Sequence, residues 1–521
     1  MTNRTLAPPP AGPELQNAAV PQGAESAHPL SATQEGMLFD TLAGRRSGVY
    51  VQQLVATLPE ALDLPAFREA WDRVAERHPA LRSCFRWEEV ARPLQEVRGR
   101  VYLPWTVEDW RSAAPAEQER LLQEYLEEDA RRAFRLDEAP LMRFALFRFG
   151  EEGYRLVWSS HHALFDGRSR LVLLREAFAV YGALREGREP PSRRHSPAGV
   201  LADAGDDAAP RGAEAFWQQL LAGVQAPTPL PGARSGEETD GDGHLAHTVR
   251  LSPGLTGELR ALAERLEVTP NTLLMGAWAV LLGRYADEED VVFGATRSCR
   301  RSVLPESEAR SAVGVFINTL PVRARIAPGA TVAGFLGALR AQWVAGREFE
   351  RTPLVRARAW SAVAPGTPLF ETLVVYEERS LQDALRAGGG EWTGRSFELR
   401  QRLAYPLVLL GYGGDSLTLR LECDPRRFER ESVERLGEQL VRVLEAFASA
   451  PEQPVEAVAL LAPEERRHLL ENVAEDGPAP ELSHALLHRF FEAQARRTPA
   501  ATALVCGGRT LSYSELDVLA E

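Results

Sequence analysis

The sequence predicts a mixed α/β or α+β protein that is built as two lobes. Segments with the two-residue alternation of a β-strand recur between segments whose apolar residues follow the 3.6-residue period of a helix. A stretch rich in Pro, Arg, Asp and Gly over residues 186–213 separates two such regions. The chain has 521 residues, of which 44% are hydrophobic and 26% charged, and this is enough for two or three globular domains.

The first region alternates strands and helices as far as residue 187. Its most regular helix is expected over 64–78, where Phe67, Trp71 and Val74 lie on one face. Helices are also expected over 116–134 and 169–187, and strands over 48–58, 81–87, 141–150 and 154–160.

The second region repeats this alternation without repeating the sequence. Helices are expected over 213–223, 255–267, 269–286 and 429–449, and strands over 243–252, 290–298, 315–326, 370–378 and 416–424.

The predicted domain organisation follows from these boundaries. Residues 1–27 carry too few apolar side chains to form a core, so we expect a flexible tail there. The two lobes are expected over 28–200 and 201–450. Residues 451–485 read as a linker with one short helix, and 486–521 begin a further unit.

The charge and composition exclude several classes of function. The net charge of -13 argues against nucleic-acid binding, which uses clustered basic residues. All 60 basic residues are arginine, so the chain has neither a Schiff-base lysine nor a P-loop lysine. We expect a cytoplasmic protein without membrane contact, since no apolar run approaches the roughly 20 residues of a membrane span. The cysteines are far apart and are expected to be reduced thiols: Cys84, Cys299, Cys423 and Cys506.

One polar stretch, "SHHALFDGRS" over 160–169, combines residue types that carry chemistry. It follows the strand expected over 154–160 and precedes a helix expected from Ser169, and such turns orient loop side chains on a rigid scaffold. A histidine can hold or pass a proton near neutral pH. The residues alone leave a structural alternative open, in which Asp166 caps the helix, Gly167 makes a tight turn and the histidines have no chemical role.

Other polar patterns favour neither a metal nor a bound cofactor. His244 and His247 in "HLAH" lack a nearby third ligand, so a surface strand is favoured over zinc. The segment "GDGHLA" precedes an expected strand, whereas a dinucleotide-binding turn follows one. No GxSxG nucleophile elbow occurs. We therefore expect no bound metal and no bound cofactor.

The stretch "HHALFDG" resembles the HHxxxDG motif of condensation domains from nonribosomal peptide synthetases. Four further stretches agree with that family in order and spacing. "PLSATQEGMLF" resembles its opening motif, "RHPALRSCF" its RHxxLRxxF segment, "VGVFINTLPVR" its GxFxNTxxxR strand, and "TPLFETLVVYE" its late tunnel-lining strand. Together these motifs cover residues 28–450. The segment from Leu487 onward resembles the opening of an adenylation domain.

The resemblance implies two chloramphenicol-acetyltransferase-like lobes arranged as a V, with a tunnel between them. Two carrier proteins would present thioesters on phosphopantetheine arms from opposite faces, and the acceptor amine would attack the donor thioester to give an amide. The implied partners are a donor acyl or peptidyl carrier protein acting in trans, and downstream adenylation and peptidyl carrier domains. A coenzyme A thioester is an alternative donor.

The resemblance also implies roles for the residues of the motif. His162 would face the reacting atoms, where it would take a proton from the amine or stabilise the tetrahedral intermediate by hydrogen bonding. His161, Asp166 and Gly167 would hold the loop in shape.

Three residues outside the motif are expected to support the site. Arg82 is the expected ion-pair partner of Asp166, and Asn318 and Thr319 are expected in the crossover region between the lobes. The sequence also departs from the family, because Arg168 stands where an aromatic residue is common and "YEERS" replaces a common Glu-Asn-Tyr-Pro ending. These departures concern the substrate class rather than the reaction type.

Two roles in synthesis remain open, and both assume that the donor comes from another protein, because the motifs begin about 27 residues after Met1. The favoured one is a starter domain that transfers a fatty or other acyl group to the first amino acid, as in a lipopeptide. The alternative is an elongation domain that takes a peptide or polyketide from an upstream synthetase. An epimerization domain or a non-catalytic recruitment domain is the alternative of another class, although the intact histidine motif and "VGVFINTLP" have the condensation form.

Overall fold

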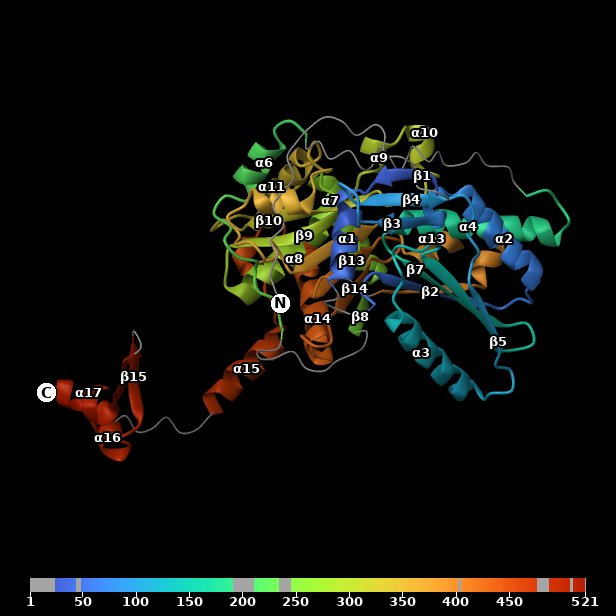
Figure 1. Ribbon diagram of the computed structural model, residues 1–521. Coiled ribbons are helices and arrows are strands. Elements are labelled where there is room, and N and C mark those ends of the chain that lie inside the picture. Colours follow the sequence, from blue (N-terminus) through green and yellow to red (C-terminus); the bar gives the residue numbers. More distant parts are fainter. Residues whose placement is uncertain are drawn as a thin grey trace. The chain divides into compact units, whose positions relative to one another are not determined.

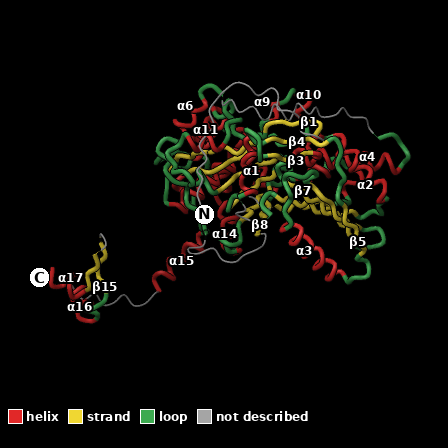
Figure 2. The backbone as a smooth tube through the Cα atoms, viewed as in Figure 1, coloured by secondary structure: helices red, strands yellow, loops and turns green. Residues whose placement is uncertain are grey.

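The helices and strands of the protein form two compact units, Met1–Leu460 and Leu461–Glu521, in the computed structural model (Figures 1 and 2). The first unit contains both predicted lobes, and its mixed helices and sheets confirm the predicted fold class. The structure describes residues 24–43, 48–190, 210–233, 245–401, 404–475, 487–506 and 509–520.

The N-terminal lobe is built on a five-stranded sheet with the order β12-β2-β7-β6-β5. Its strands are antiparallel except for the parallel pair β5 and β6. The strands are β2 (Val51–Leu58), β5 (Trp105–Asp109), β6 (Met142–Arg148), β7 (Tyr154–His161) and β12 (Ser396–Gln401); the helices are α1 (Ala32–Leu42), α2 (Leu64–Arg77), η1 (Pro79–Arg82), α3 (Pro115–Arg131) and α4 (Gly167–Arg185).

Both faces of this sheet are covered around its inner strands, which explains the unbroken apolar run of β7 over residues 156–158. Leu156 and Trp158 of β7 pack in the core that includes α2 and α4, whereas Val157 between them packs in the core that includes α3. Successive strand residues point to opposite faces, so a sheet that is buried on both sides needs a continuous apolar run. Asp63 caps α2 by accepting a hydrogen bond from the backbone N–H of Ala66.

A smaller sheet of β1 (Ala24–Pro29), β4 (Leu94–Arg98) and β3 (Ser83–Arg86) lies at the start of the lobe. Strand β1 pairs antiparallel with β4 from Ala24 onward. The prediction of a flexible tail over residues 1–27 is therefore wrong for residues 24–27. Composition could not predict this strand, because its backbone pairs with a strand some 70 residues later in the chain. The rest of that segment lies outside the described residues.

The edge strand β12 comes from the part of the chain that was assigned to the C-terminal lobe. Its residues pair antiparallel with β2, with Leu399 opposite Leu54. It follows α13 (Leu381–Arg386) and η2 (Gly390–Thr393), and Leu385 belongs to the core of the N-terminal lobe. The expectation of two contiguous lobes is thus wrong here, because a two-residue period identifies a strand without identifying its sheet.

The C-terminal lobe is built on a six-stranded sheet with the order β10-β9-β11-β13-β14-β8. The pairs β11–β9 and β11–β13 are parallel and the others antiparallel. The strands are β8 (Leu245–Arg250), β9 (Asp290–Ser298), β10 (Ile317–Arg325), β11 (Thr372–Glu377), β13 (Leu407–Tyr412) and β14 (Thr418–Cys423); the helices are α6 (Ala213–Leu220), α7 (Pro253–Arg265), α8 (Pro270–Ala286), α9 (Arg300–Val303), α10 (Glu306–Ala309), α11 (Val332–Ala345), α12 (Leu354–Ala359), α14 (Arg430–Ser449) and η3 (Val455–Ala457).

Helices α7, α8, α11 and α14 pack on one face of this sheet and share a single core with it. Helix α8 lies in the middle of that core, and its residues from Thr272 to Gly283 are all buried. The opposite face carries Leu373, Val408 and Leu410, with Val375 and Tyr412 only partly buried beside them. At β9 and β10 this opposite face is covered by α6 and α12, which pack on Val292 and Leu320, so its less covered part lies at β11 and β13.

The second unit is small. It contains α15 (Pro463–Glu475), α16 (Leu487–Arg497), β15 (Thr502–Cys506), β16 (Arg509–Ser512) and α17 (Tyr513–Ala520), and the two strands form an antiparallel pair. Several of its apolar side chains are exposed, among them Val505 and Val518. Within the described ranges of the whole chain, no helix is long and apolar enough to cross a membrane.

We expect Arg395 to hold the β12 crossover segment on the N-terminal lobe. Its Nε atom donates to Glu60 at 2.7 Å, its Nη2 atom donates to Glu391 at 2.6 Å, and its guanidinium lies 4.2 Å from the ring centre of Phe178. Replacing Arg395 with alanine should lower the free energy of unfolding by about 3 kcal/mol, because it removes a buried cation and its packing.

The matched control is Arg400→Ala on β12 itself. Arg400 is partly exposed, pairs with the exposed Glu398 at 3.3 Å and donates to the side chain of Gln123 on α3 at 2.8 Å. Both partners can be hydrated when it is lost, so its loss should cost no more than about 1 kcal/mol. Urea unfolding of both variants measures the difference. Equal costs would show that Arg395 does not hold the segment.

Candidate active site between the lobes

The two histidines lie where the sequence predicts them, in the turn between a strand and a helix. Strand β7 ends at His161 and α4 begins at Gly167, two residues before the expected start. The turn is tied to both lobes through its backbone. The N–H of His162 donates to the carbonyl of Tyr50 at 2.8 Å, and the N–H of Asp166 donates to the carbonyl of Gly314 at 3.0 Å.

Asp166 connects the turn to the C-terminal lobe. It caps α4, since its Oδ1 atom accepts from the backbone N–H and the hydroxyl of Ser169, both at 2.8 Å. The same oxygen accepts from Arg300 at 2.7 Å, and Oδ2 accepts from the backbone N–H of Phe316 at 3.1 Å. Both Asp166 and Arg300 are buried, with 2% and 4% of their surface exposed. The expected Asp166 helix cap is therefore present, but the same carboxylate also forms an ion pair between the lobes.

The prediction that Arg82 pairs with Asp166 is wrong. Arg82 instead donates to Glu25 of β1 at 2.7 Å and to the carbonyl of Arg98 of β4. These contacts hold η1 against the small sheet. An arginine can pair with any carboxylate that the fold brings near it. The actual partner of Arg82 and the actual partner of Asp166 both lie in segments outside the two motifs, so the motifs alone could not identify them.

Asn318 and Thr319 lie on β10, at an edge of the C-terminal sheet. The side-chain amide of Asn318 donates to the carbonyls of Glu350 and Thr352 at 2.9 and 2.8 Å. Its Oδ1 atom accepts from the N–H of Thr319 at 3.0 Å and from the hydroxyl of Thr33 on α1 at 3.4 Å. The Thr33 hydroxyl has a closer acceptor in the carbonyl of Ile317 at 2.8 Å, so the start of β10 anchors α1 to the C-terminal lobe.

His161 is a structural residue whose two ring nitrogens are both occupied. The backbone N–H of Ala163 donates to Nδ1 at 3.2 Å, so the proton of the neutral ring is on Nε2, which lies 3.2 Å from the hydroxyl of Thr41. Only 1% of its surface is exposed. Burial, followed by the effect of His162, lowers the pKa of His161 to about 3.

His162 has the opposite proton arrangement. Its Nδ1 atom lies 3.3 Å from the carbonyl of Phe165, and a carbonyl only accepts, so Nδ1 carries the proton. The Nε2 atom is left with a lone pair and has no hydrogen bond within the described residues. Burial, followed by the positive charge of Arg170, lowers the pKa of His162 to about 4. The ring is therefore neutral at physiological pH and can accept a hydrogen bond or a proton.

Gly167 lies against a carboxylate of the other lobe. A Cβ atom at this position would be 2.9 Å from Oε1 of Glu377, the last residue of β11, so glycine permits this close approach. Arg170 lies one turn further along α4, where it donates to Gln52 and its guanidinium is 5.4 Å from the ring centre of Phe165. Arg170 stays charged, although burial lowers its pKa to about 10.

Solvent reaches several side chains here although protein surrounds them. His162 and Tyr412 are partly exposed and Glu377 is exposed, yet burial is the main cause of the shifted pKa of each one. Burial raises the pKa of Glu377 to about 7 and raises that of Tyr412. We call His162, Gly167, Arg170, Glu377 and Tyr412 the interface site. It combines a neutral imidazole, a free carboxylate and a fixed cation, which can bind an amine and move a proton.

Sequence reasoning missed Arg300, Arg170 and Glu377. Arg170 stands three residues after Gly167, so the helical period could have placed it one turn above the motif. No such signal exists for Arg300 or Glu377, because both reach the motif from the other lobe. The "YEERS" departure does contain Glu377, but the sequence shows only that the segment is unusual.

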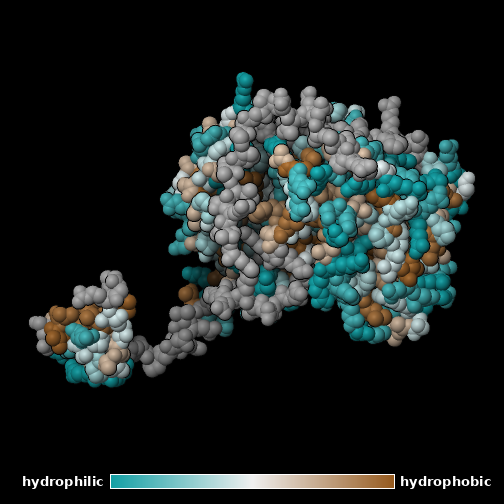
Figure 3. Space-filling model, viewed as in Figure 1, coloured by the Kyte–Doolittle hydropathy of each residue, from teal (hydrophilic) through white to brown (hydrophobic). Residues whose placement is uncertain are grey.

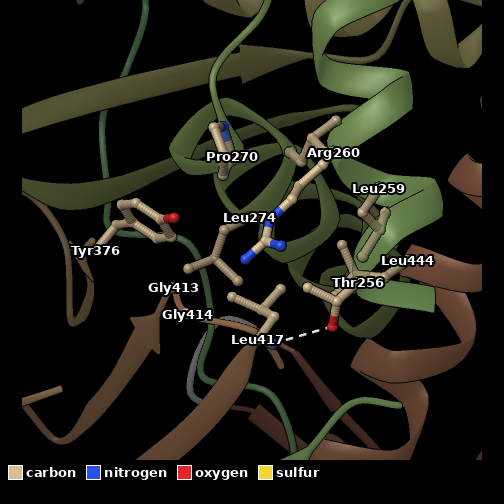
Figure 4. Close-up of a pocket in the computed structure, with 11 residues that line it drawn as sticks. Thr256, Leu259, Arg260, Pro270, Leu274, Tyr376, Gly413, Gly414, Leu417 and Leu444 are labelled. Carbon is tan, nitrogen blue, oxygen red and sulfur yellow. Dashed lines mark hydrogen bonds between the residues drawn. The ribbon is translucent and has the colours of Figure 1, made fainter. Parts of the chain in front are cut away.

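A small cavity in the C-terminal lobe is separate from the interface site (Figure 4). It lies between α7, α8 and the sheet, with Arg260 and Tyr376 beside apolar residues such as Leu274. Its volume of about 40 Å³ has room for only a few water molecules. Tyr376 and Glu377 are neighbours on β11, so they point to opposite faces of the sheet. The cavity is too small for a thioester substrate.

No group of His, Cys, Asp and Glu side chains in the described part of the chain has the arrangement of a metal site. His247 lies on β8, paired with Leu421 of β14. His244, the other histidine of the weak zinc pattern, lies outside the described residues.

The ion pair between Asp166 and Arg300 should stabilise the fold more than the pair between Arg82 and Glu25. Arg300→Ala leaves a buried carboxylate without its cation, which should cost about 3–5 kcal/mol. Arg82→Ala also removes a buried guanidinium and its bond to the Arg98 carbonyl, but it leaves Glu25, whose side chain is 50% exposed and stays hydrated, so its cost should be smaller, about 2 kcal/mol. Urea unfolding midpoints measure both, and a larger loss in Arg82→Ala would contradict this ranking.

His161 should make the protein sensitive to acid. Its pKa is about 3 in the folded protein and about 6.5 in the unfolded chain, so below pH 6.5 only the unfolded chain takes up the proton. Stability should therefore fall as the pH drops, by about 2 kcal/mol at pH 5 from this group. His161→Asn, which keeps an acceptor near Nδ1, should lose less stability between about pH 7.5 and pH 5 than the native protein. Equal losses in the two proteins would exclude this role.

Comparison with known families agrees with the geometry of the site. A family model described as a condensation domain matches residues 24–470. A linear gramicidin synthase from Brevibacillus parabrevis is 37% identical to this chain, of which the match covers 95%, but it covers 6% of the relative. Surfactin synthase subunit 2 from Bacillus subtilis (strain 168) is 29% identical, with 95% and 14% covered. The chain spans only a small part of the length of these relatives.

Solved structures share the fold at low sequence identity. The starter condensation domain of rhizomide synthetase has a TM-score of 0.69 and 20% identity, with 84% of this chain and 98% of that chain covered. A four-domain nonribosomal peptide synthetase has a TM-score of 0.72 and 20% identity, with 95% and 38% covered. Taken with the family model, these likenesses show that the chain belongs to the condensation-domain family of nonribosomal peptide synthetases, enzymes that form amide bonds.

Proposed function

We propose that this protein joins the acyl group of a donor thioester to the α-amine of an aminoacyl thioester on a carrier protein. The observation that carries the proposal is the free Nε2 atom of a neutral His162, held between the two lobes. Both substrates would arrive on phosphopantetheine arms of carrier proteins, and a coenzyme A thioester is an alternative form of the donor.

The position of the ring proton in His162 decides between its two expected roles, which are accepting a proton from the amine and donating a hydrogen bond to the tetrahedral intermediate. Because Nδ1–H is directed at the Phe165 carbonyl, Nε2 accepts and does not donate, so it cannot hydrogen-bond to an oxyanion. Taking a proton from a free α-ammonium, with a pKa of about 7.7–8, onto a ring with a pKa of about 4 would cost about 5 kcal/mol. His162 is better suited to accept a hydrogen bond from the neutral amine, orient its lone pair, and take a proton after the C–N bond forms.

The proposed reaction needs no reactant besides the two thioesters. The neutral amine attacks the thioester carbonyl carbon and forms a C–N bond. The tetrahedral intermediate passes an N–H proton to Nε2 of His162, the C–S bond breaks, and the leaving thiolate takes up that proton as a thiol. Positioning two tethered substrates supplies much of the rate, since effective molarities reach about 10⁵ M or more.

Helix α1 supports the proposal that a carrier protein docks near the site. Thr41 of α1 contacts His161, so this helix is directly coupled to the histidine turn. Phe39 and Leu42 on the same helix are 66% and 48% exposed, and apolar side chains gather in this part of the face shown in Figure 3. Exposed apolar residues beside a reaction site favour contact with another protein.

The donor class is the finer part of the proposal. We propose a starter role, in which the donor is a fatty or other acyl group, with a peptidyl donor for elongation as the alternative. The related rhizomide starter domain is known in complex with C8-CoA and Leu-SNAC, which is a property of that protein. At 20% identity this likeness shows a shared fold only. The transfer assay described below identifies the donor that this chain uses.

The second unit extends the proposal to the downstream partner. We propose that residues 486–521 begin an adenylation domain, as the resemblance from Leu487 onward implies. The exposed Leu504, Val505 and Val518 in the small unit are in keeping with a surface that further chain would cover.

His162→Ala should lower acyl transfer by about 100-fold or more, because it removes the acceptor for the amine proton. The assay follows the intact mass of an aminoacyl carrier protein supplied with fatty acyl-coenzyme A, a fatty acyl carrier and a peptidyl carrier in competition. The donor that is consumed separates the starter role from elongation. His247→Ala on β8 is the matched control and should keep native activity. Unchanged transfer by His162→Ala would refute the role of His162, and no transfer by the native protein with loaded partners would favour an epimerization or recruitment role.

A further inference from the structure

Glu377 is a free carboxylate at the interface site. Its side chain is exposed, and within the described part of the chain it has no hydrogen bond and no ion pair. The other acidic side chain near the motif, Asp166, is 2% exposed and fully occupied by Ser169, Arg300 and the backbone. An exposed carboxylate that no protein group pairs with is available to a positively charged group of a ligand.

The carboxylate is directed at the turn that carries the histidines. Its Oε1 atom lies 2.9 Å from the point where a side chain at Gly167 would begin, so the missing Cβ leaves room for it. Glu377 is on the same face of the C-terminal sheet as Val375 and Tyr412, opposite the face that packs on α7 and α8. It therefore faces the N-terminal lobe from across the lobe interface.

We propose that Glu377 binds the α-ammonium group of the acceptor substrate and takes its first proton. The inference rests on the proposed function, because it assigns the acceptor amine to one side of that same site. The step is a proton transfer from R–NH₃⁺ to the carboxylate, which gives R–NH₂ and a carboxylic acid. The neutral amine then attacks the thioester, and the acid later releases its proton to solvent, which reaches the exposed side chain.

The charges around Glu377 fit this role. Arg170 and Asp166 face it from α4, and Tyr412 lies opposite it on β13. Burial, together with Asp166, raises the pKa of Glu377 to about 7, and Arg170 opposes that rise. Transfer from an α-ammonium with a pKa of about 7.7–8 is then unfavourable by only about tenfold, compared with about 5,000-fold for transfer to His162.

The two proton acceptors would thus act in sequence. Glu377 would receive the proton that the ammonium must lose before attack, and His162 the proton that becomes acidic after the C–N bond forms. His162 lies in the N-terminal lobe and Glu377 in the C-terminal lobe. Because a carboxylate anchors an ammonium but not a neutral amine, its benefit should depend on pH in a way that a packing role would not.

Glu377→Gln tests the proposal, because it keeps the size of the side chain and removes the charge and the basic oxygen. We expect kcat/KM for the acceptor to fall about tenfold or more near pH 7, with KM raised, and to approach the native value near pH 9, where the acceptor amine is already neutral. Glu378→Gln, which changes the next and also exposed carboxylate, should behave like the native protein at every pH.

The outcomes are distinguishable. The same fractional loss at every pH in Glu377→Gln would assign the residue a structural role and overturn the proposal, as would native activity near pH 7. A thermal unfolding midpoint equal to that of the native protein excludes misfolding as the cause of a loss. The test is valid only if the native protein and Glu378→Gln both transfer an acyl group. If neither of them transfers an acyl group from any donor, the proposed function is wrong.

Discussion

The ion pair between Asp166 and Arg300 is the interaction on which the site depends. It caps α4, fixes the end of the histidine turn, and joins that turn to the segment that leads into β10. A turn fixed only by its own strand and helix would move with one lobe. Because the Asp166 carboxylate also accepts from the backbone of Phe316, the position of His162 is defined relative to both lobes.

The two adjacent histidines have different roles because backbone hydrogen bonds place the ring proton on Nε2 in His161 and on Nδ1 in His162. An N–H group faces Nδ1 of His161, whereas a carbonyl faces Nδ1 of His162. Burial and the nearby guanidinium of Arg170 keep His162 neutral, so its basicity is low and its free nitrogen is available at all physiological pH values. The residue type alone therefore does not predict the role of each histidine, whereas the hydrogen bonds of each ring do.

The sequence predicts what depends on local pattern. The apolar run of β7, the helical period of α4 and the capping role of Asp166 are all visible in about thirty residues. The sequence does not predict contacts between distant segments. Asp166 and Arg300 are 134 positions apart, and β12 joins β2 across the lobes. Arg82 was a wrong choice of partner for the same reason, since any of the 60 arginines could reach Asp166 until the fold is known.

On the proposed assignment, the active site is complete only when the lobes meet. His162 belongs to the N-terminal lobe and Glu377 to the C-terminal sheet, and the close approach of Glu377 to Gly167 is where the two sides touch. A small separation of the lobes would leave each residue intact but place the amine too far from one of its two proton acceptors. Rates that depend on positioning fall steeply with such displacements. The contacts that join the lobes are therefore part of the chemistry, even though none of them touches the substrates.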